Sequence, residues 1–260
     1  ILDRVAEPAI IIEYYLQSQR EAVQQPLNEV KVILVGQGGV GKTSLVRRLI
    51  DDDFDLHETK TEGIQVRRWL IAADGQDICL NIWDFGGQEI MHATHQFFLT
   101  RRSLYLLVLD ARKGEQEGNL EYWLQLIQSF GAASPVIVVV NQVDQHPLDL
   151  NRRGLREKYP AIKAFVNTSC KERTGIDELA EAIQREVGAL PHIHASWLKS
   201  WFAVKRRLET MEQDYISYDT YWRLCVDAGV REAQDQRALI DYLHDLGIVL
   251  HYRDDPRLEE

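Results

Sequence analysis

A glycine-rich run is the first group of residues whose spacing could support chemistry. It follows the pattern G-x-x-x-x-G-K-[ST], and the members expected to contact a ligand are Gly36, Gly38, Gly39, Val40, Gly41, Lys42, Thr43 and Ser44. Glycines permit a tight turn that directs successive backbone N–H groups toward one point, and the positive end of a following helix adds to that field. Lys42 would place a charge on the outer phosphates, and the Thr43 hydroxyl would ligate Mg²⁺. The run therefore predicts a nucleoside-phosphate site rather than a glycine turn without a ligand.

A second group, Asp84-Phe85-Gly86-Gly87-Gln88, follows an apolar run ending at Trp83. Asp84 could hold Mg²⁺ through a water molecule, and the Gly87 amide could contact the terminal phosphate. The side-chain amide of Gln88 could orient an attacking water. An ordinary turn with an Asp–Gly pair is the alternative, but the glycine-rich run favours a phosphate-hydrolysing site.

Two further groups could recognise a nucleobase. They are Asn141, Gln142 and Asp144, and then Ser169, Cys170 and Lys171. The Asp144 carboxylate can accept from two N–H groups on the Watson–Crick edge of guanine, whereas adenine presents the wrong donors. The backbone amides of the second group can bind the base oxygen. These groups indicate GTP or GDP as ligand and oppose the alternative of a P-loop ATPase.

Alternating strands and helices would position these groups. Strands are expected at 30–35, 64–73, 77–83, 104–110, 136–140 and 162–167, and helices at 42–50, 89–99, 117–130, 151–158 and 175–187. Asp74-Gly75 is a hairpin turn signal between the second and third strands. Such alternation predicts an α/β fold with a mostly parallel sheet covered on both faces.

The two ends of the chain show other patterns. Residues 2–19 predict a helix, and 24–28, broken by Pro26, a short linker. After Pro191 the alternation stops, and apolar stripes predict three helices, one of them capped by Ser217, followed by a short strand at 248–252. We therefore expect three parts: 1–28, the α/β domain at 29–190, and a small winged-helix-like α+β module at 191–260.

Composition narrows the class of protein. The net charge of −10 opposes a general affinity for nucleic acid or anionic membranes. No apolar stretch is long enough to span a bilayer. The three cysteines lie far apart, which favours a reduced, cytoplasmic setting, and the chain has no initiator Met, as expected of a piece of a longer protein.

In this order, the four groups resemble the Ras-like GTPases, and more closely the Roc domain of Roco proteins. That resemblance rests on Trp83 to Glu89, on His92 to Phe98 and on Thr61-Glu62-Gly63-Ile64. The tail, with Trp197-Leu198, Tyr242 to Gly247 and Asp254-Asp255-Pro256, resembles the first part of a COR domain. The family implies a six-stranded sheet with one antiparallel edge pair.

The resemblance also implies functional roles. It makes Thr61 the threonine that reaches Mg²⁺ only in the triphosphate state, with Thr59 as a rival, and makes loops 51–62 and 85–94 the two switches. It implies leucine-rich repeats before this chain, further COR residues after it, and homodimers that respond to nucleotide. Because most of COR is missing here, a monomeric state is compatible with this chain by itself.

Two residues bear on whether this chain shares the activity that the resemblance implies. The base-recognition motif usually has Lys where this chain has Gln142, which could weaken guanine binding, whereas Gln88 keeps the residue type of Ras-like hydrolases. No arginine stands out as a catalytic finger, so slow turnover is expected, on the order of 10⁻⁴ to 10⁻² per second. The alternative is a guanine-nucleotide-binding dimerisation scaffold with negligible hydrolysis.

Two other clusters have simpler interpretations. Asp51-Asp52-Asp53 is expected to be a solvated surface. The aromatic residues Trp197, Trp201 and Phe202 are expected to pack in a core or against another domain.

Overall fold

The computed structural model describes residues 24–61, 63–73, 75–86, 98–112, 116–146, 148–193 and 196–251. The predicted helix at 2–19 and nearly all of the one at 89–99 lie outside these ranges. The chain divides into two compact units. One contains 28–193 together with 244–250, and the other contains 1–27, 194–243 and 251–260.

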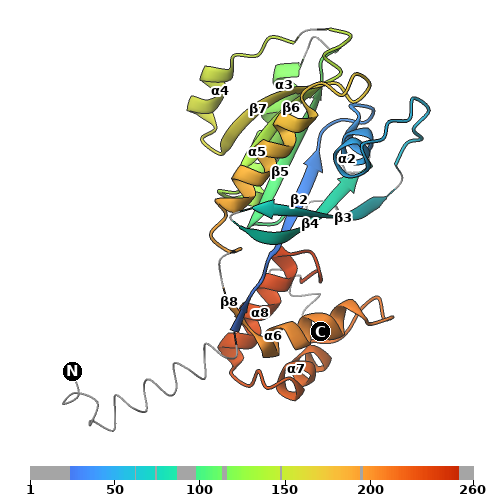
Figure 1. Cartoon of the computed structure of the whole chain (residues 1–260). Helices are drawn as coiled ribbons and strands as arrows, with labels where there is room; N and C mark the ends of the chain where they lie inside the picture. Colours follow the sequence, from blue (N-terminus) through green and yellow to red (C-terminus); the bar gives the residue numbers. More distant parts are fainter. Residues whose placement is uncertain are drawn as a thin grey trace, which may run out of the picture. The chain divides into compact units, whose positions relative to one another are not determined.

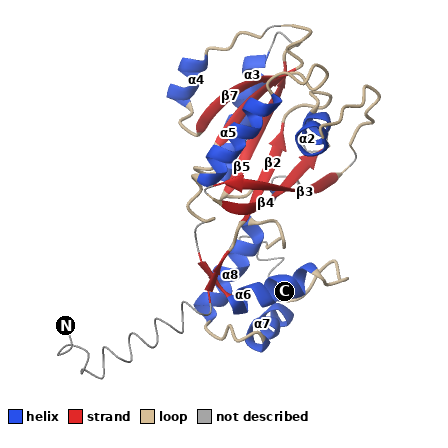
Figure 2. Cartoon of the chain, viewed as in Figure 1, coloured by secondary structure: helices blue, strands red, loops and turns tan. Residues whose placement is uncertain are grey.

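A six-stranded sheet forms the centre of the first unit (Figure 2). Its strands are β2 (Glu29–Val35), β3 (Ile64–Ala73), β4 (Gln76–Phe85), β5 (Ser103–Asp110), β6 (Val136–Asn141) and β7 (Ile162–Thr168). Their order is β3-β4-β2-β5-β6-β7, and only the edge pair β3–β4 is antiparallel. This confirms the predicted mostly parallel sheet with one antiparallel edge pair.

Helices cover both faces of this sheet (Figure 1). On one face, α2 (Lys42–Asp51) and α5 (Ile176–Gly188) enclose a core that includes Val32 of β2. On the other face, α3 (Gln116–Gly131) and α4 (Arg152–Lys158) pack over Ile33 of the same strand. Successive strand residues point to opposite faces, so strands buried on both sides must be apolar throughout. The sequence of β6, VIVVVN, is fully buried for this reason.

The parallel strands direct their carboxyl ends to one edge of the sheet. Gly36 follows β2, while Asp84, Asn141 and Thr168 stand near or at the ends of β4, β6 and β7. In open α/β sheets this edge is where ligands bind. The topology therefore brings together the four groups of residues that the sequence analysis selected.

In the part of the second unit that the structure describes, there are a two-stranded sheet and three helices. β1 (Gln24–Pro26) pairs antiparallel with β8 (Ser196–Leu198), and α6 (Lys199–Glu209), α7 (Tyr218–Asp227) and α8 (Ala233–Asp245) follow. Ser217 caps α7 as predicted, since its side chain accepts from the Thr220 amide. The predicted linker at 24–28 is wrong, because 24–26 forms a strand whose partner lies far away in the sequence.

An aromatic cluster forms the core of this unit. The Trp197 ring lies 5.5 Å from that of Trp201, 5.6 Å from that of Phe202 and 5.4 Å from that of Tyr242. Trp197 is 2% exposed, which confirms the packing role expected for this group.

Residues 248–251 form no strand, so the terminal strand predicted at 248–252 is wrong over the part that the structure describes. Their composition suits a strand, but α8 ends through Gly247, which has φ of +78° and lies against the Trp83 ring. The Asp245 carbonyl accepts from Thr100 Oγ1 at 2.9 Å, and the Asp245 carboxylate pairs with Arg102 at 2.6 Å. These contacts hold the segment 244–250 within the first unit, beside the six-stranded sheet. Within the described residues, no helix is both long and apolar enough to cross a bilayer.

Candidate nucleotide-binding site

The glycine-rich run forms the turn between β2 and α2, as predicted. Gly36 has φ of +139°, and a Cβ placed on it would lie 2.2 Å from the Val108 carbonyl oxygen. Gly41, the N-cap of α2, has φ of +89°, and a Cβ there would lie 2.5 Å from the Asn141 side chain. Only glycine fits both positions, because the backbone is left-handed and its neighbours are rigid.

Lys42 begins α2 and is only 5% exposed. Its Nζ donates to the Gly36 and Gln37 carbonyls at 3.0 and 3.1 Å. Burial lowers the pKa of Lys42 to about 8, against the opposite influence of the Asp84 carboxylate. The ammonium thus lies within the loop itself, where a phosphate could replace its carbonyl partners.

Three oxygen-bearing side chains from three elements meet beside Lys42. Thr43 Oγ1 donates to Asp84 Oδ2 at 2.5 Å and lies 2.5 Å from Thr61 Oγ1. Since the Thr43 hydroxyl has one proton, Thr61 must donate to it. The structure therefore brings together the three residues predicted as metal ligands.

The surroundings of Asp84 suit a divalent cation. Asp84 is 2% exposed, and its Oδ1 has no hydrogen-bond partner among the described residues. Burial raises the pKa of Asp84, and the Glu58 carboxylate raises it further, while the hydrogen bond from Thr43 and the charge of Lys42 act against both. A buried carboxylate with a free oxygen beside two hydroxyls is a donor set that Mg²⁺ prefers.

Glu58 is a site neighbour that the sequence analysis did not select. Its Oε2 is buried and has no hydrogen-bond partner among the described residues, while its Oε1 lies 3.0 Å from Arg47 on α2. Because several acidic residues precede Glu58 in the same loop, nothing in the local sequence separated it from them.

The end of β4 contacts the segment that carries Thr61. The Gly86 amide donates to the Gly63 carbonyl at 3.0 Å. A Cβ on Gly86 would lie 2.5 Å from the Thr61 carbonyl oxygen. Gly87 and Gln88 follow directly but lie outside the described residues, so their roles stay predictions.

The predicted base-recognition residues form one connected cluster. Asn141 donates to the Val40 carbonyl at 3.0 Å and accepts from Thr168 Oγ1 at 3.2 Å, so it joins the phosphate loop to the end of β7. Asp144 Oδ1 accepts from Ser169 Oγ at 2.6 Å. The structure thus joins the Asn141–Asp144 group directly to the Ser169–Lys171 group, a contact that the sequence did not predict.

Gln142, Cys170 and Lys171 complete the cluster. Gln142 has φ of +65°, and its Nε2 lies 3.4 Å from the Gly39 carbonyl, so its side chain extends over the phosphate loop. Cys170 is buried, and burial raises the pKa of its thiol to about 11. Lys171 is exposed at the surface of the loop. Ser44 is half-buried in the first turn of α2.

The sequence also did not predict that arginines near this site bind the acidic residues of the loop 51–62. Arg47 lies 3.7 Å from both Asp53 and Asp55, and Arg67 of β3 binds Asp51 through two hydrogen bonds of 2.8 and 2.9 Å. Asp52 is bound by two other arginines, from α2 and from the loop after β7. The acidic run 51–53 is exposed, as expected, but each carboxylate has an arginine partner.

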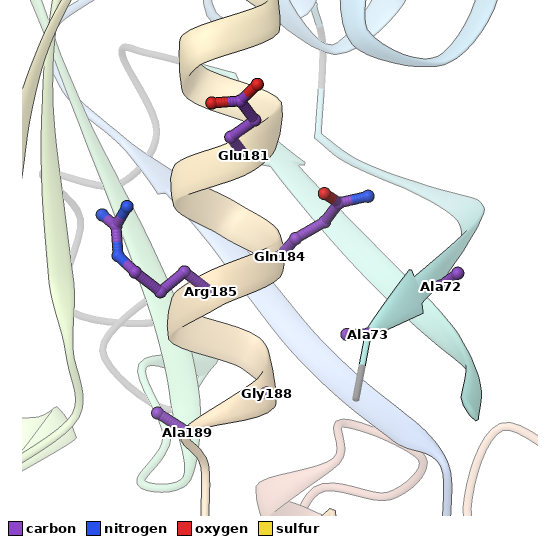
Figure 3. Close-up of a pocket in the computed structure, with 7 residues that line it drawn as sticks. All are labelled: Ala72, Ala73, Glu181, Gln184, Arg185, Gly188 and Ala189. Atoms are coloured by element: carbon purple, nitrogen blue, oxygen red, sulfur yellow. The ribbon is translucent and has the colours of Figure 1, made fainter. Parts of the chain in front are cut away.

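A separate pocket of about 570 Å³ lies between the end of β3 and α5 (Figure 3). Its lining residues are Ala72, Ala73, Glu181, Gln184, Arg185, Gly188 and Ala189. None of these is a predicted nucleotide ligand.

Comparisons with known proteins support the interpretation of this edge of the sheet. A family model described as "Ras of Complex, Roc, domain of DAPkinase" matches residues 31–144, and one described as "C-terminal of Roc, COR-A domain" matches residues 199–260. A solved structure titled "Structure of methanosarcina barkeri Roco2 RocCORdC bound to GDP" is 48% identical, with a TM-score of 0.84. The match covers 89% of this chain and 71% of that one.

Two curated relatives show the range of the similarity. A Roc-COR-CHAT protease of Runella zeae is 29% identical over 92% of this chain, which spans 28% of that protein's length. The Ras-related protein Rab-18-B of Danio rerio is 30% identical over 62% of this chain and 82% of its own length. Since the Roc-type sheet, the phosphate loop at its carboxyl edge and these matches agree, the chain belongs to the Roco family, as a Roc GTPase domain followed by the amino-terminal part of COR.

Proposed function

We propose that this chain binds GTP and GDP together with Mg²⁺, hydrolyses GTP slowly and changes conformation with the nucleotide. The observation that carries this proposal is the convergence of Thr43, Thr61 and Asp84 within 2.5 Å contacts beside the buried Lys42. Three separate segments of the chain would thus supply one centre that binds both the phosphates and the cation.

The proposed roles at the phosphates follow from this geometry. The amides of the glycine-rich loop and Lys42 would hold the phosphates, and Thr43 and Asp84 would hold Mg²⁺. Thr61 would help to hold Mg²⁺ only in the triphosphate state, so its loop would order and relax with the nucleotide. When bound, Mg²⁺ would neutralise phosphate charge.

At the base, we assign recognition of guanine to Asp144, with Asn141 holding the loop and Gln142 covering part of the ring. The Ser169–Asp144 hydrogen bond supports this assignment, because it fixes the carboxylate before the base arrives. The amides of Cys170 and Lys171 would bind the guanine oxygen O6.

For hydrolysis, we assign Gln88 to orient the attacking water and the Gly87 amide to contact the terminal phosphate. Turnover would be slow because no arginine stands out, among the residues that the structure describes, as a source of positive charge for the transition state. Arg102, which follows the second switch, is already bound to Asp245. A scaffold that binds guanine nucleotide with negligible hydrolysis is the competing function.

Within a longer parent protein, nucleotide state would control dimerisation through COR. The Roc-COR-CHAT relative, of which this chain spans 28%, supports a multidomain parent. A cytoplasmic setting, with leucine-rich repeats before this chain, is part of the same proposal.

Calorimetry with GDP, a non-hydrolysable GTP analogue and ADP, with and without Mg²⁺, tests the binding proposal. Guanine nucleotides should bind at micromolar or lower concentrations with Mg²⁺, and ADP should not. Absence of GDP binding by folded protein would refute the proposal.

Phosphate release from GTP separates the switch from the scaffold. We expect Gln88→Leu to slow release while GDP and GTP affinity stays within about twofold of that of the unsubstituted protein, since the residue acts on water rather than on the nucleotide. No measurable release from the unsubstituted protein would favour the scaffold, and unchanged release in Gln88→Leu would remove Gln88 from the mechanism.

A further inference from the structure

Arg48 of α2 makes an unusual contact with the loop predicted to meet the guanine base. Its Nε and Nη2 both donate to the Cys170 carbonyl, at 3.0 and 2.8 Å. The Arg48 side chain is 13% exposed, and Cys170 is 4% exposed, so the contact is shielded from water. Charged hydrogen bonds in such surroundings are stronger than at the surface.

Other contacts fix the guanidinium of Arg48 in place. Its Nη1 donates to the Asp52 carbonyl at 2.8 Å, and its charged group lies 5.8 Å from the centre of the Phe54 ring. Since Arg48 is part of the helix that begins at the phosphate loop, it joins the phosphate-binding element to the base-binding loop.

The orientation of one peptide group follows from this contact. In a planar trans peptide the C=O and the next N–H point in opposite directions. Because the Cys170 carbonyl points at Arg48, the Lys171 N–H points away from it. Two hydrogen bonds to the same carbonyl oppose rotation of this peptide group more strongly than a single bond would.

The rest of the loop is already closed by its own contacts. The Ser169 amide donates to the Thr174 carbonyl at 3.0 Å, and Ser169 Oγ binds Asp144. These contacts hold the start of the loop, whereas Arg48 is the described side chain that binds the carbonyl between Cys170 and Lys171.

We propose that Arg48 is a positioning residue for guanine: it holds the 170–171 peptide so that the backbone amides of this loop meet the base oxygen O6. This inference rests on the proposed guanine-nucleotide function and adds a specificity determinant outside the four motifs. An arginine is required because its planar fork can donate twice to one carbonyl, whereas a lysine offers a point charge.

The loop also supplies a matched control. Arg173 donates through Nε to Asp52 at 2.8 Å and binds Asp177 through two bonds of 2.8 and 2.9 Å. Its side chain is 45% exposed, and these pairs lie at the surface, where they contribute little. Arg173→Ala therefore removes an arginine from the same loop without releasing the Cys170 carbonyl.

The test compares the affinities of three nucleotides for the unsubstituted protein and for its variants. GDP carries every base contact, inosine 5′-diphosphate lacks only the 2-amino group that would meet Asp144, and 2-aminopurine riboside 5′-diphosphate lacks O6 together with the N1–H group. Because the same analogue is measured on each protein, its weaker contact with Asp144 cancels when a variant is compared with the unsubstituted protein. For Arg48→Ala we expect GDP affinity to fall about tenfold or more, the size of one lost charge-assisted hydrogen bond. The affinity for the analogue without O6 should change less than threefold, and the ratio of GDP to inosine diphosphate affinity should stay constant.

Conservative variants and the control complete the design. Arg48→Lys should lose part of the GDP affinity, and this variant serves as the test if Arg48→Ala does not fold. Arg173→Ala should bind all three ligands with the affinity of the unsubstituted protein. An equal loss for GDP and for the analogue without O6 would overturn the inference, as would the same pattern in Arg173→Ala. Failure of the unsubstituted protein to bind GDP would instead refute the proposed function itself.

Discussion

Among single side chains, Lys42 is the group on which phosphate binding depends most directly. Its ammonium is held by two backbone carbonyls, which are weaker partners than phosphate oxygens. Lys42→Ala should therefore reduce GDP affinity at least 100-fold, or about 2.7 kcal/mol. Calorimetry measures the affinity, and thermal unfolding without nucleotide checks that the fold persists. A GDP affinity within threefold of that of the unsubstituted protein would contradict the phosphate-binding role of Lys42.

Asp144 should decide which base is accepted. In Asp144→Asn, the side-chain oxygen can still accept from Ser169, but the NH₂ group replaces an acceptor with a donor. Guanine then loses an acceptor, whereas xanthine presents a carbonyl in place of the 2-amino group and gains a donor. We expect GDP affinity to fall and xanthosine diphosphate affinity to rise, each by about tenfold or more. Ser169→Ala is the control, because it frees the carboxylate without changing its acceptors and should not invert the preference.

Local motifs were enough to select these residues as candidates, but they did not predict the contacts between distant segments that hold the site together. Lys42, Thr43, Asp84 and Asp144 could be selected because each has a short, recognisable neighbourhood in the sequence. Arg48 could not, since its partner in the loop after β7 becomes a neighbour only after the sheet has formed. An arginine on an amphipathic helix is most simply interpreted as a solvated surface residue.

Between secondary-structure elements, the close approach of the β4 end to the Thr61 segment is open to test. A methyl group at Gly86 would lie 2.5 Å from the Thr61 carbonyl oxygen, which is backbone and cannot move alone. Gly86→Ala should therefore displace Thr61 from Thr43 and weaken binding of a GTP analogue with Mg²⁺ about tenfold or more. GDP binding should change less, because Thr61 is assigned to the triphosphate state.

Gly75→Ala is the matched control for this pair of strands. Gly75 follows β3 at φ of +74°, and a Cβ there meets nothing within 4 Å. The substitution should lower the unfolding free energy through backbone strain, by about 1 kcal/mol, and leave the preference between GDP and the GTP analogue unchanged. Equal effects of both substitutions on that preference would show that Gly86 acts only through stability.

The strands were predictable to different degrees for physical reasons. Residues 64–73 form a strand with the predicted bounds, because a hairpin signal and a glycine define its ends. The predictions for 24–26 and 248–251 were both wrong: the predicted linker is a strand, and the predicted strand is not one. The first segment pairs with β8, which lies far from it in the sequence, and the second has apolar residues typical of a strand but no strand partner among the described residues. Short segments have the state that their tertiary neighbours impose.

Across the sheet-containing unit, Lys31 links the start of β2 to segments from two distant parts of the chain. This buried side chain donates to the Phe98 carbonyl at 2.9 Å and to Thr100 Oγ1 at 3.3 Å, and lies 4.3 Å from the centre of the Trp83 ring. Thr100 in turn donates to the Asp245 carbonyl. Burial lowers the pKa of Lys31 to about 7, although the Asp245 carboxylate opposes that change. Stability of this unit should therefore depend on pH through a group outside the nucleotide site.

The direction of this dependence follows from proton binding. Above pH 7 the folded protein releases the Lys31 proton, whereas the unfolded chain retains it until its ordinary pKa of 10.5. Because the unfolded state then binds more protons, this group makes the unfolding free energy rise with pH between about 7 and 10.5, by at most about 1.4 kcal/mol per pH unit. Below pH 7 both states are protonated, and the dependence disappears.

Lys31→Met isolates this contribution, since the two proteins share every other titrating group. Denaturant unfolding of both proteins between pH 6 and pH 9.5 should give a stability difference that is constant at the acid end. Above pH 7 the difference should move steadily in favour of the lysine protein, whatever its sign at pH 6. The trend distinguishes titration from packing, because a lost contact shifts the difference by one amount at every pH. A difference that does not vary with pH would mean that Lys31 keeps its proton in the fold through Asp245 and its hydrogen bonds.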